Sequence, residues 1–139
     1  MRLKILSSGT WKVLAEVDSH GACAIEAALV RYSQSKQYSA AVTGLLALWE
    51  RIPLEGPRRL GTDLYHRVDT EHDIYEFIKG NLRLYCFEAK GRLVVCSHVD
   101  KKSTQKTKAR DKQRAIELRK RYLKAEADKL LEIIEEKDE

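Results

Sequence analysis

The sequence contains no apolar run approaching the roughly 18 residues that a membrane-spanning helix needs. Its first residues, Met1 to Leu6, carry two cations and are followed at once by Ser7 and Ser8, which leaves no apolar core long enough for a signal peptide. Two prolines and seven glycines in 139 residues are too few for a long disordered segment. We therefore expect a folded, soluble, cytosolic protein without a membrane partner.

Paired cysteines are also missing. Cys23, Cys86 and Cys96 lie far apart in the chain and do not show the Cys-x-x-Cys spacing of zinc and redox sites. The four histidines lack metal-ligand spacing, and the chain has no phosphate-binding glycine loop, His-Glu-x-x-His pattern or serine elbow. The sequence thus predicts buried free cysteines, and neither a metal nor a cofactor.

Positive charge is abundant and unevenly distributed. The formal net charge is +5, but residues 126–139 carry seven acidic and two basic side chains, so residues 1–125 carry +10. Residues 101–124 alone contain eleven Lys and Arg against Asp111 and Glu117. Such a block predicts a surface that binds a polyanion, and RNA above all. The alternative is a solvated helix face, which is the commoner meaning of a charge run.

The length fits a single domain over residues 1–139, and the order of patterns indicates an α+β fold. Residues 11–17 alternate as a strand, and a first helix carries apolar positions from Ile25 to Tyr32. A second helix carries an apolar stripe from Val42 to Ile52 and is expected to stop at Pro53. Residues 53–73 indicate mostly loop, with at most a short strand over 63–68.

Period-two patterns then predict an antiparallel meander of strands over 74–78, 82–88 and 92–99. The joints at 80–81 and 89–91 suit tight hairpins. The middle strand places two groups of side chains on opposite faces, namely Leu82, Leu84 and Cys86 on one and Arg83, Tyr85 and Phe87 on the other. We expect one of these faces to pack on the two helices.

From Ala109 onward the helical period returns and predicts a helix of about 27 residues, or ~40 Å. Its apolar stripe consists of Ala109, Ile116, Leu123, Ala127, Leu130 and Ile134. The sequence predicts that residues 126–139 form an acidic extension of this helix. The stripe packs either on the chain's own sheet or on a partner, in a homo- or hetero-oligomer. The predicted order of elements is β-α-α-βββ-α.

Chemically capable side chains gather at one end of the predicted meander. They are Lys79, Arg83, His98, Lys101, Lys102 and Lys106. Cations around a phosphate can stabilise a phosphoryl transition state, and a histidine that titrates near neutrality can carry a proton. This combination predicts polyanion binding, and catalysis less directly.

Each of these side chains also has a structural alternative. Arg83 can pair with Glu76 on the neighbouring strand, and His98 at a strand end can be structural. Tyr85 can stack on an RNA base or belong to the core. The lysines can simply be solvated.

Residues 74–87 read IYEFIKGNLRLYCF, residues 94–98 read VVCSH and residues 101–103 read KKS. Together these segments resemble the HigB-like toxins of the RelE/ParE superfamily, which belong to type II toxin–antitoxin systems. The similarity is best over residues 62–124. It implies a RelE-like fold, with an antiparallel sheet packed on two N-terminal helices and a long C-terminal helix. Many relatives are metal-independent endoribonucleases that cut mRNA in the ribosomal decoding site.

The resemblance also implies roles for particular residues. Arg83 would contact the scissile phosphate, Lys101 and Lys102 would bind the phosphate backbone, and His98 would carry a proton or stack on a base. Lys79 would be a second phosphate contact. The catalytic set is then Arg83, His98 and Lys102, and the RNA-binding set is Lys79, Tyr85, Lys101 and Lys106.

Two positions depart from the family pattern. Many relatives have an arginine where Ile78 stands, and many start the last helix with Lys-Thr-Pro, where this chain has Lys106-Thr107-Lys108.

The expected function is that of a type II toxin, a ribosome-dependent mRNA endoribonuclease (mRNA interferase) that inhibits translation. Its partners would be mRNA on the ribosome and a cognate antitoxin with a helix-turn-helix DNA-binding domain. Two alternatives stay open. One is a ParE-type inhibitor of DNA gyrase, which shares the fold without the ribonuclease residues. The other is a non-catalytic toxin homologue that forms a repressor complex with its antitoxin.

Overall fold

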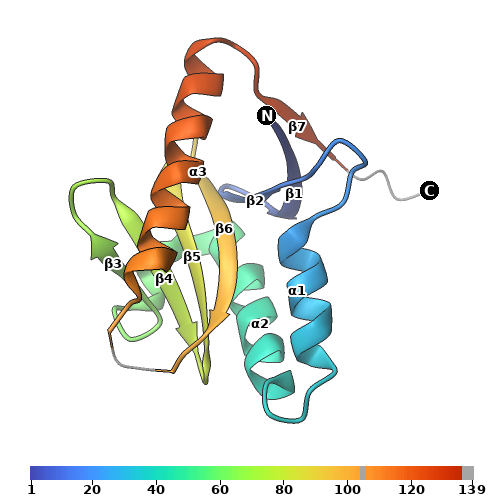
Figure 1. Ribbon diagram of the computed structural model, residues 1–139, viewed down its shortest axis with the longest axis vertical. Helices are drawn as coiled ribbons and strands as arrows, with labels where there is room; N and C mark the ends of the chain where they lie inside the picture. Colours follow the sequence, from blue (N-terminus) through green and yellow to red (C-terminus); the bar gives the residue numbers. More distant parts are fainter. Residues whose placement is uncertain (104–105, 136–139) are drawn as a thin grey trace.

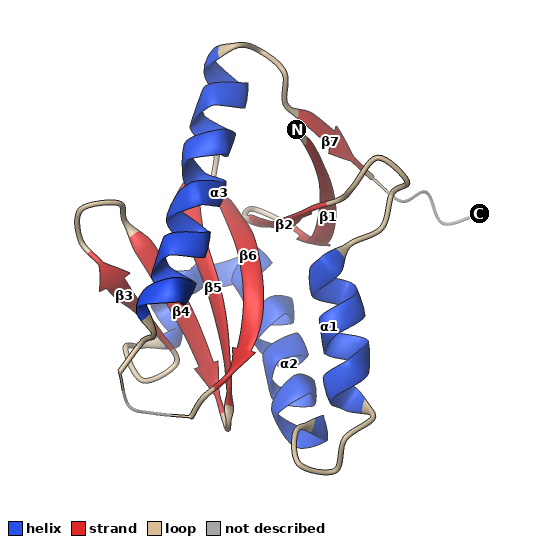
Figure 2. Cartoon of the chain, in the orientation of Figure 1, coloured by secondary structure: helices blue, strands red, loops and turns tan. Residues whose placement is uncertain are grey.

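Helices cover both faces of a single mixed sheet (Figures 1 and 2). The computed structural model describes residues 1–103 and 106–135. Its elements, in chain order, are β1 (Arg2–Ser8), β2 (Lys12–Glu16), α1 (Ala24–Ser33), α2 (Ser39–Glu55), the 3-10 turn η1 (Pro57–Leu60), β3 (Tyr65–Asp69), β4 (Ile74–Lys79), β5 (Leu82–Ala89), β6 (Leu93–Lys101), α3 (Ala109–Ala127) and β7 (Glu132–Ile134).

The α+β class and the meander are confirmed, but the sheet is not purely antiparallel. Within the described residues it has seven strands in the order β3-β4-β5-β6-β2-β1-β7. Strands β3 to β6 are antiparallel neighbours, as are β1 and β2. However, β2 runs parallel to β6, and β7 runs parallel to β1. These parallel pairs join segments far apart in the sequence, which no local period-two pattern could indicate.

Strand β1 was not predicted. Its residues alternate in polarity from Arg2 to Ile5, and then Leu6 breaks the alternation. The pairing of β1 with β2 shifts register between Ile5 and Ser7, so Leu6 is the extra residue of a β-bulge. The bulge therefore explains why the sequence pattern of this strand was weak.

The sheet separates two hydrophobic clusters. Leu82, Leu84 and Cys86 of β5 belong to the cluster beneath α1 and α2, whereas Tyr85 and Phe87 belong to the cluster beneath α3. The predicted alternation of β5 is therefore confirmed, and both of its faces are covered by helices (Figure 1). The three cysteines, Cys23, Cys86 and Cys96, are free and buried, as predicted. Among the described residues, every helix is too short or too polar to traverse a bilayer.

Helix α2 continues past Pro53, where it was expected to stop. Proline lacks the N–H that would bond to the carbonyl of residue i−4, here Trp49. The hydroxyl of Ser7 donates a hydrogen bond to that carbonyl instead, at 2.9 Å. The last turn of α2 thus tolerates the proline because a side chain of β1 satisfies the exposed acceptor.

The C-terminal helix was predicted too long. Helix α3 ends at Ala127 because Lys129 adopts a left-handed conformation with φ of +58°. The N–H of Leu130 then bonds to the carbonyl of Ala125, and the N–H of Lys129 bonds to that of Glu126, as in a Schellman motif. Glycine is the usual residue at such a position, so Lys129 gave no stop signal.

The apolar stripe predicted for this helix is also wrong. The buried residues of α3 are Asp111, Ala115, Ile116, Leu118 and Tyr122, of which only Ile116 belongs to the predicted set. Leu123 is 41% exposed. Residues 132–134 lie in β7, beside the N-terminal strand (Figure 1). Of the segment predicted to extend the helix, residues 132–134 are therefore a strand of the chain's own sheet, and residues 136–139 lie outside the described residues.

Candidate functional site

A β-bulge in β6 brings together the first group of polar side chains. Tyr85 of β5 pairs with His98, but the next residue of β5, Cys86, pairs with Cys96, so Ser97 is an extra residue. A bulge re-aims the side chains around it. Here the Ser97 hydroxyl lies 2.8 Å from Nδ1 of His98.

His98 is held on three sides beneath α3. Its Nε2 lies 2.9 Å from Oδ1 of Asp111, in the first turn of α3, and its ring stacks on Tyr85 with centroids 4.9 Å apart. Only 4% of the residue is exposed. The second carboxylate oxygen of Asp111 is buried and finds no hydrogen-bond donor among the described residues. The imidazole is thus fixed in orientation, and Asp111 keeps one unused acceptor.

Burial lowers the pKa of His98 below its usual value, because the charged ring loses hydration, and the hydrogen bond to Asp111 partly opposes this shift. The ring is therefore neutral near pH 7. Because the Asp111 carboxylate accepts, Nε2 carries the proton, and Nδ1 is left to accept from the Ser97 hydroxyl. The three residues form a hydrogen-bonded chain whose Ser97 end is partly exposed.

The hydrogen-bonded series of Asp111, His98 and Ser97 ends, at Ser97, in a groove between α1 and α3. Strand β2 pairs with β6 only as far as Ala15 and Cys96. Within the described residues, β6 from Ser97 onward has no strand on that side, and residues 97–99 form the floor of the groove. We call this feature the Ser97 groove.

Arg31 from α1 and Arg114 from α3 line the Ser97 groove, and Arg110 of α3 lines an adjoining hollow that shares His98, Val99 and Arg114 with the groove and also contains Asp100. Arg110 lies 3.6 Å from Asp100 but its side chain is 74% exposed. The charge of Arg114 further lowers the pKa of His98. A guanidinium presents a planar fork of donors that matches a phosphate. The groove therefore combines a hydroxyl, a buried imidazole–carboxylate pair and cations suited to an anionic ligand.

A second polar network lies on the same face of the sheet, around the ion pair of Glu76 and Arg83. Nη1 of Arg83 is 3.1 Å from both carboxylate oxygens of Glu76, and the two side chains are 4% and 1% exposed. Thr107 contacts both partners, at 3.1 and 3.3 Å. Nε2 of His66 lies 2.8 Å from Glu76. The network ties the segment before α3 to strands β3, β4 and β5.

The register brings Arg83 and His98 together, as predicted. Arg83 pairs with Asp100, two residues beyond His98 on β6, so both side chains lie on the α3 face of neighbouring strands. Arg83 nevertheless takes its structural alternative, because its guanidinium is buried against Glu76. Tyr85 does the same. It is 1% exposed and stacks on His98, so its ring is a support for the imidazole and not an exposed platform for a base.

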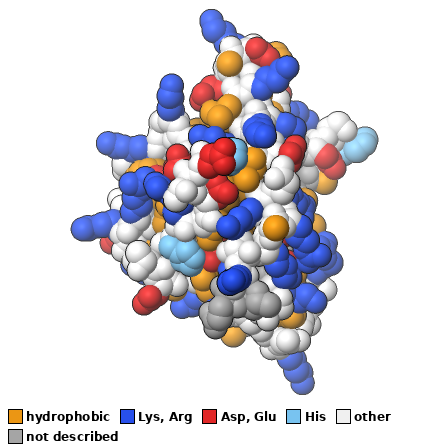
Figure 3. All heavy atoms as spheres, turned by 60° about the vertical axis from the view of Figure 1, so that its left-hand side comes forward, with side chains coloured by type: hydrophobic (Ala, Val, Ile, Leu, Met, Phe, Trp, Pro, Cys, Tyr) orange, Lys and Arg blue, Asp and Glu red, His pale blue; other side chains and the backbone are white. Residues whose placement is uncertain are grey.

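The predicted lysines lie around the end of β6 and the segment before α3. Lys101 is exposed at the end of β6, and the N–H of Lys102 bonds to the carbonyl of Asn81 at 2.8 Å. Lys106 is exposed too, and Lys108 pairs with Asp100 at 3.1 Å. Figure 3 shows Lys and Arg side chains spread along the face that carries β3 and α3, with acidic groups between them. This part of the surface is cationic, as the sequence predicted.

Lys79 is the exception, because it lies on the opposite face of the sheet. A Cβ placed on Gly44 of α2 would lie 2.5 Å from Cγ of Lys79, so the lysine stem crosses the helix at that glycine. The structure therefore separates Lys79 from Arg83 and His98, contrary to the prediction of a shared phosphate site. Among residues 1–103 and 106–135, no three His, Cys, Asp or Glu side chains converge as a metal ion would need.

A family model for phage-derived Gp49-like proteins (DUF891) matches residues 34–120, more than half of the chain. The chain belongs to the Gp49-like family. This family is associated with the toxins of toxin–antitoxin systems. The comparison with curated proteins gives no match.

The Gp49-like match includes most of the site. The chain of Ser97, His98 and Asp111 lies within the matched residues, as do Glu76 and Arg83, whereas Arg31 precedes them. The described residues of this chain form an α+β fold with one mixed sheet and three α-helices.

Sequence reasoning missed five residues of this candidate site: Ser97, Asp111, Arg31, Arg110 and Arg114. A usable signal existed for two of them, since Arg110 and Arg114 are four residues apart and must share a helix face. None existed for Ser97, whose position depends on a bulge. Asp111 was counted only as an acid within a basic block.

Proposed function

We propose that this Gp49-like protein is the toxin of a type II toxin–antitoxin system and acts as a ribosome-dependent endoribonuclease on mRNA. The observation that supports the proposal is the Ser97 groove with its adjoining hollow, where a neutral, buried His98 lies among three arginines. A cognate antitoxin, with a helix-turn-helix DNA-binding domain, would hold the toxin inactive.

The chemistry requires a base, a proton donor and cations. The ribose 2′-oxygen attacks the adjacent phosphorus, the bond from phosphorus to the 5′-oxygen breaks, and a 2′,3′-cyclic phosphate forms. Because His98 is buried, the proton of the 2′-hydroxyl would reach its Nδ1 through the Ser97 hydroxyl, and the imidazolium would be stabilised by Asp111. The same proton can return to the leaving 5′-oxygen.

Arginines would stabilise the charge that develops on the phosphate. Arg114 lies on the α3 side of the Ser97 groove, with Arg110 in the adjoining hollow, and Arg31 lies on the α1 side, so a phosphate between them would have donors from two elements. In this proposal Lys101, Lys102 and Lys106 bind the flanking RNA backbone, and Arg83 fixes the sheet beneath the site.

The test is primer extension on a reporter mRNA in a cell-free translation reaction, with ribosomes present or omitted. New 5′ ends that need both the protein and ribosomes are expected. Ser97→Ala and Arg114→Ala should each lower cleavage by roughly 100-fold, as loss of a proton relay or phosphate contact does. Lys120→Ala is the matched control, since it removes an exposed cation of the same helix outside the groove.

One observation favours a non-catalytic homologue as the second candidate. Both His98 and Arg83 are almost fully buried and already hydrogen-bonded. If the mRNA stays full-length at saturating protein while ribosomes translate, the ribonuclease hypothesis is rejected and the non-catalytic hypothesis is favoured. A gyrase supercoiling assay would then separate it from a gyrase inhibitor of similar fold.

A further inference from the structure

The hydrogen-bonded series of Asp111, His98 and Ser97 contains the three parts of a serine-hydrolase triad. Oγ of Ser97 lies 2.8 Å from Nδ1 of His98, and Nε2 of the same ring lies 2.9 Å from Oδ1 of Asp111. A triad is recognised by the geometry and role of each group and not by its place in the sequence. Here Nδ1 is the acceptor of the hydroxyl proton, and Nε2 donates to the carboxylate that orients the ring. The series can therefore activate a hydroxyl for nucleophilic attack.

Ser97 is the member of this series that a molecule in solution can reach. His98 and Asp111 are buried, whereas Ser97 is partly exposed and lies on the floor of the Ser97 groove. Because the hydroxyl proton of Ser97 is directed to the imidazole, the lone pairs of Oγ are left for a molecule in the groove. The structure thus places an accessible nucleophile over a base that is shielded from water.

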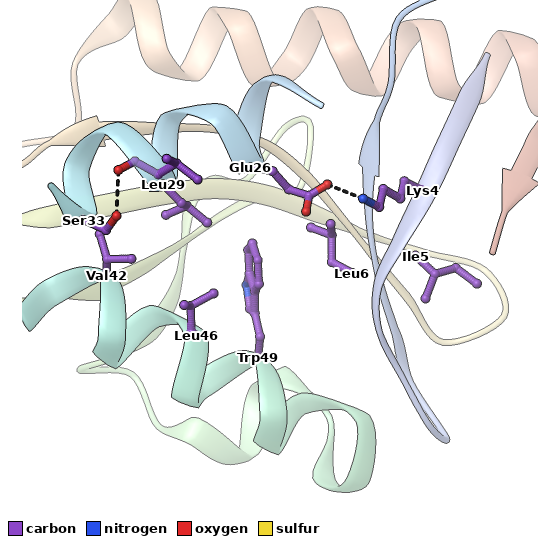
Figure 4. Close-up of a pocket in the computed structure, with 10 residues that line it drawn as sticks. Lys4, Ile5, Leu6, Glu26, Leu29, Ser33, Val42, Leu46 and Trp49 are labelled. Carbon is purple, nitrogen blue, oxygen red and sulfur yellow. Dashed lines mark hydrogen bonds and ion pairs between the residues drawn. The ribbon is translucent and has the colours of Figure 1, made fainter. Parts of the chain in front are cut away.

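Ser33 shows the arrangement of a serine without such a base. It lines a separate pocket between β1, α1 and α2, which Figure 4 shows from close by. Its exposed hydroxyl donates to the carbonyl of Val30 at 2.6 Å, a common arrangement for a serine within a helix. Among the described residues, no histidine lines this pocket. Ser33 is therefore an internal control for the reactivity of Ser97.

The lining of the Ser97 groove indicates which kind of molecule can react there. The volume of the groove is about 320 Å³, which suits a small organic molecule. The wall on the α1 side presents three small apolar side chains, Ala24, Ala27 and Ala28. Arg31 lies on this wall and Arg114 on the α3 side. An apolar surface between two guanidinium groups fits a short acyl chain that carries a negative charge.

We propose that Ser97 is the nucleophile of a second activity, the hydrolysis of small esters whose acyl chain carries a carboxylate. Oγ of Ser97 bonds to the carbonyl carbon of the ester while its proton passes to Nδ1 of His98. The bond from that carbon to the alcohol oxygen then breaks, and the alcohol leaves with the proton from Nδ1. Water attacks the acyl-serine in the same way, which releases the acid and restores the hydroxyl.

The two arginines of the groove bind different charges of the substrate. Arg114 lies close enough to His98 for its charge to lower the pKa of the ring, so it stabilises the negative oxygen of the tetrahedral intermediate. Arg31, on the α1 side, binds the carboxylate of the acyl chain. This activity goes beyond RNA cleavage, in which Ser97 passes on a proton but forms no covalent bond.

The first experiment is covalent labelling of the purified full chain with a fluorophosphonate, which phosphonylates activated serines and releases fluoride. Peptide mass spectrometry at successive times measures the labelling of Ser97 and Ser33 in the same sample. We expect Ser97 to react at least about 10-fold faster than Ser33, and His98→Gln to slow the labelling of Ser97 by roughly 100-fold, because the base is lost. Circular dichroism checks the folding of His98→Gln, and the comparison within the wild type stands without it.

The second experiment compares the hydrolysis of the mono-p-nitrophenyl ester of succinate with that of p-nitrophenyl acetate. We expect kcat/KM to be at least about 10-fold larger for the succinate ester, as for a gained hydrogen bond between charged groups. Arg31→Met should remove this difference. Lys36→Met is the matched control, since it removes an exposed cation just beyond α1 and outside the groove.

The proposed nucleophile is overturned if Ser97 stays unlabelled at saturating fluorophosphonate, if Ser33 reacts as fast, or if a folded His98→Gln is labelled at the wild-type rate. Equal hydrolysis of the two esters overturns the proposed substrate class. Neither experiment contains RNA or ribosomes, so their failure leaves the ribonuclease proposal standing. In the same way, an mRNA that stays full-length in the primer-extension test does not count against a covalent adduct on Ser97.

Discussion

Glu76 and Arg83 form an ion pair that is almost closed to water on the α3 face of the sheet. Each charge has lost hydration, so each depends on the other and on Thr107 and His66 for compensation. Arg83 is therefore a poor choice for testing RNA cleavage, since its removal changes the fold's stability first.

Arg83→Met should lower the free energy of unfolding by about 3–5 kcal/mol, because it leaves the Glu76 carboxylate buried without its cation. Adding Glu76→Gln should recover part of this loss, since the unpaired charge is then gone. Urea unfolding of the wild type, both single variants and the double variant measures the coupling. Losses that simply add would show that the pair is not coupled as its geometry indicates.

His98 should make the stability depend on pH. Burial lowers its folded-state pKa, so between that value and the unfolded value of about 6.5 the unfolded chain binds more protons. The free energy of unfolding should therefore rise with pH through this window and level off above it. His98→Gln, which keeps a donor for Asp111, should flatten the curve there.

Asp100 is a second titrating group near His98, and its effect on stability must be separated from that of His98. Burial raises the pKa of Asp100, but the hydrogen bonds that it accepts from Lys101 and Lys108 outweigh burial and leave this pKa below its usual value. The effect of Asp100 on the free energy of unfolding therefore lies at a more acidic pH, and it should still be present in His98→Gln. Stability that increases on acidification below pH 6.5 would contradict the assignment of a neutral His98. The measurement is urea unfolding at closely spaced pH values.

At the scale of elements, β7 replaces the end of the predicted helix and closes half of the β1 edge. Ile134 packs against the cluster beneath α1 and α2, whereas Ile133, its neighbour in β7, is 44% exposed. The strand therefore contributes one partly buried side chain to the core. Its removal also exposes the outer edge of β1 at Arg2, Leu3 and Lys4.

Ile134→Ala should lower the free energy of unfolding by about 1–2 kcal/mol, less than for a fully buried isoleucine. Ile133→Ala, the matched substitution one residue earlier, should cost less than about 0.5 kcal/mol. Thermal or urea unfolding of both variants measures the difference. Equal effects would mean that β7 does not dock as described.

For the whole molecule, the charge layout governs encounters with nucleic acid. Residues 1–125 carry +10, and α3 contributes cations on several sides. Binding to single-stranded RNA should therefore weaken steeply with salt, because each phosphate contact releases counterions.

The double variant Arg110→Ala/Arg114→Ala should weaken the binding of a labelled 12-nucleotide RNA and reduce the slope of log K against log salt by about 1.4, as expected for two lost contacts. The matched double variant Lys120→Ala/Lys124→Ala removes the same charge from the same helix outside the Ser97 groove. Fluorescence anisotropy between about 50 and 200 mM salt compares them. Equal losses would show that RNA follows the general field of α3 and not the groove.

Several structural features of this protein could be predicted from short-range patterns in its sequence. The alternation of Leu82 to Phe87 fixed which side chains of β5 face each layer, and the free cysteines and cationic surface followed from composition and spacing. The period of a strand or helix depends only on backbone geometry, so it can be recognised locally. The α+β class and the meander were correct for that reason.

Other features depended on atoms far apart in the sequence. The sequence offered the pair of Arg83 with Glu76 as one alternative, and only the tertiary structure decided for it. The tertiary structure also placed Lys79 on the far face and joined His98 to Asp111 through the docking of α3. Helix α3 ended at the left-handed Lys129, where the sequence has no glycine that would have indicated a helix end. Whether a charged side chain is free or paired depends on register, bulges and helix docking, and these are decided by the packing of the whole chain.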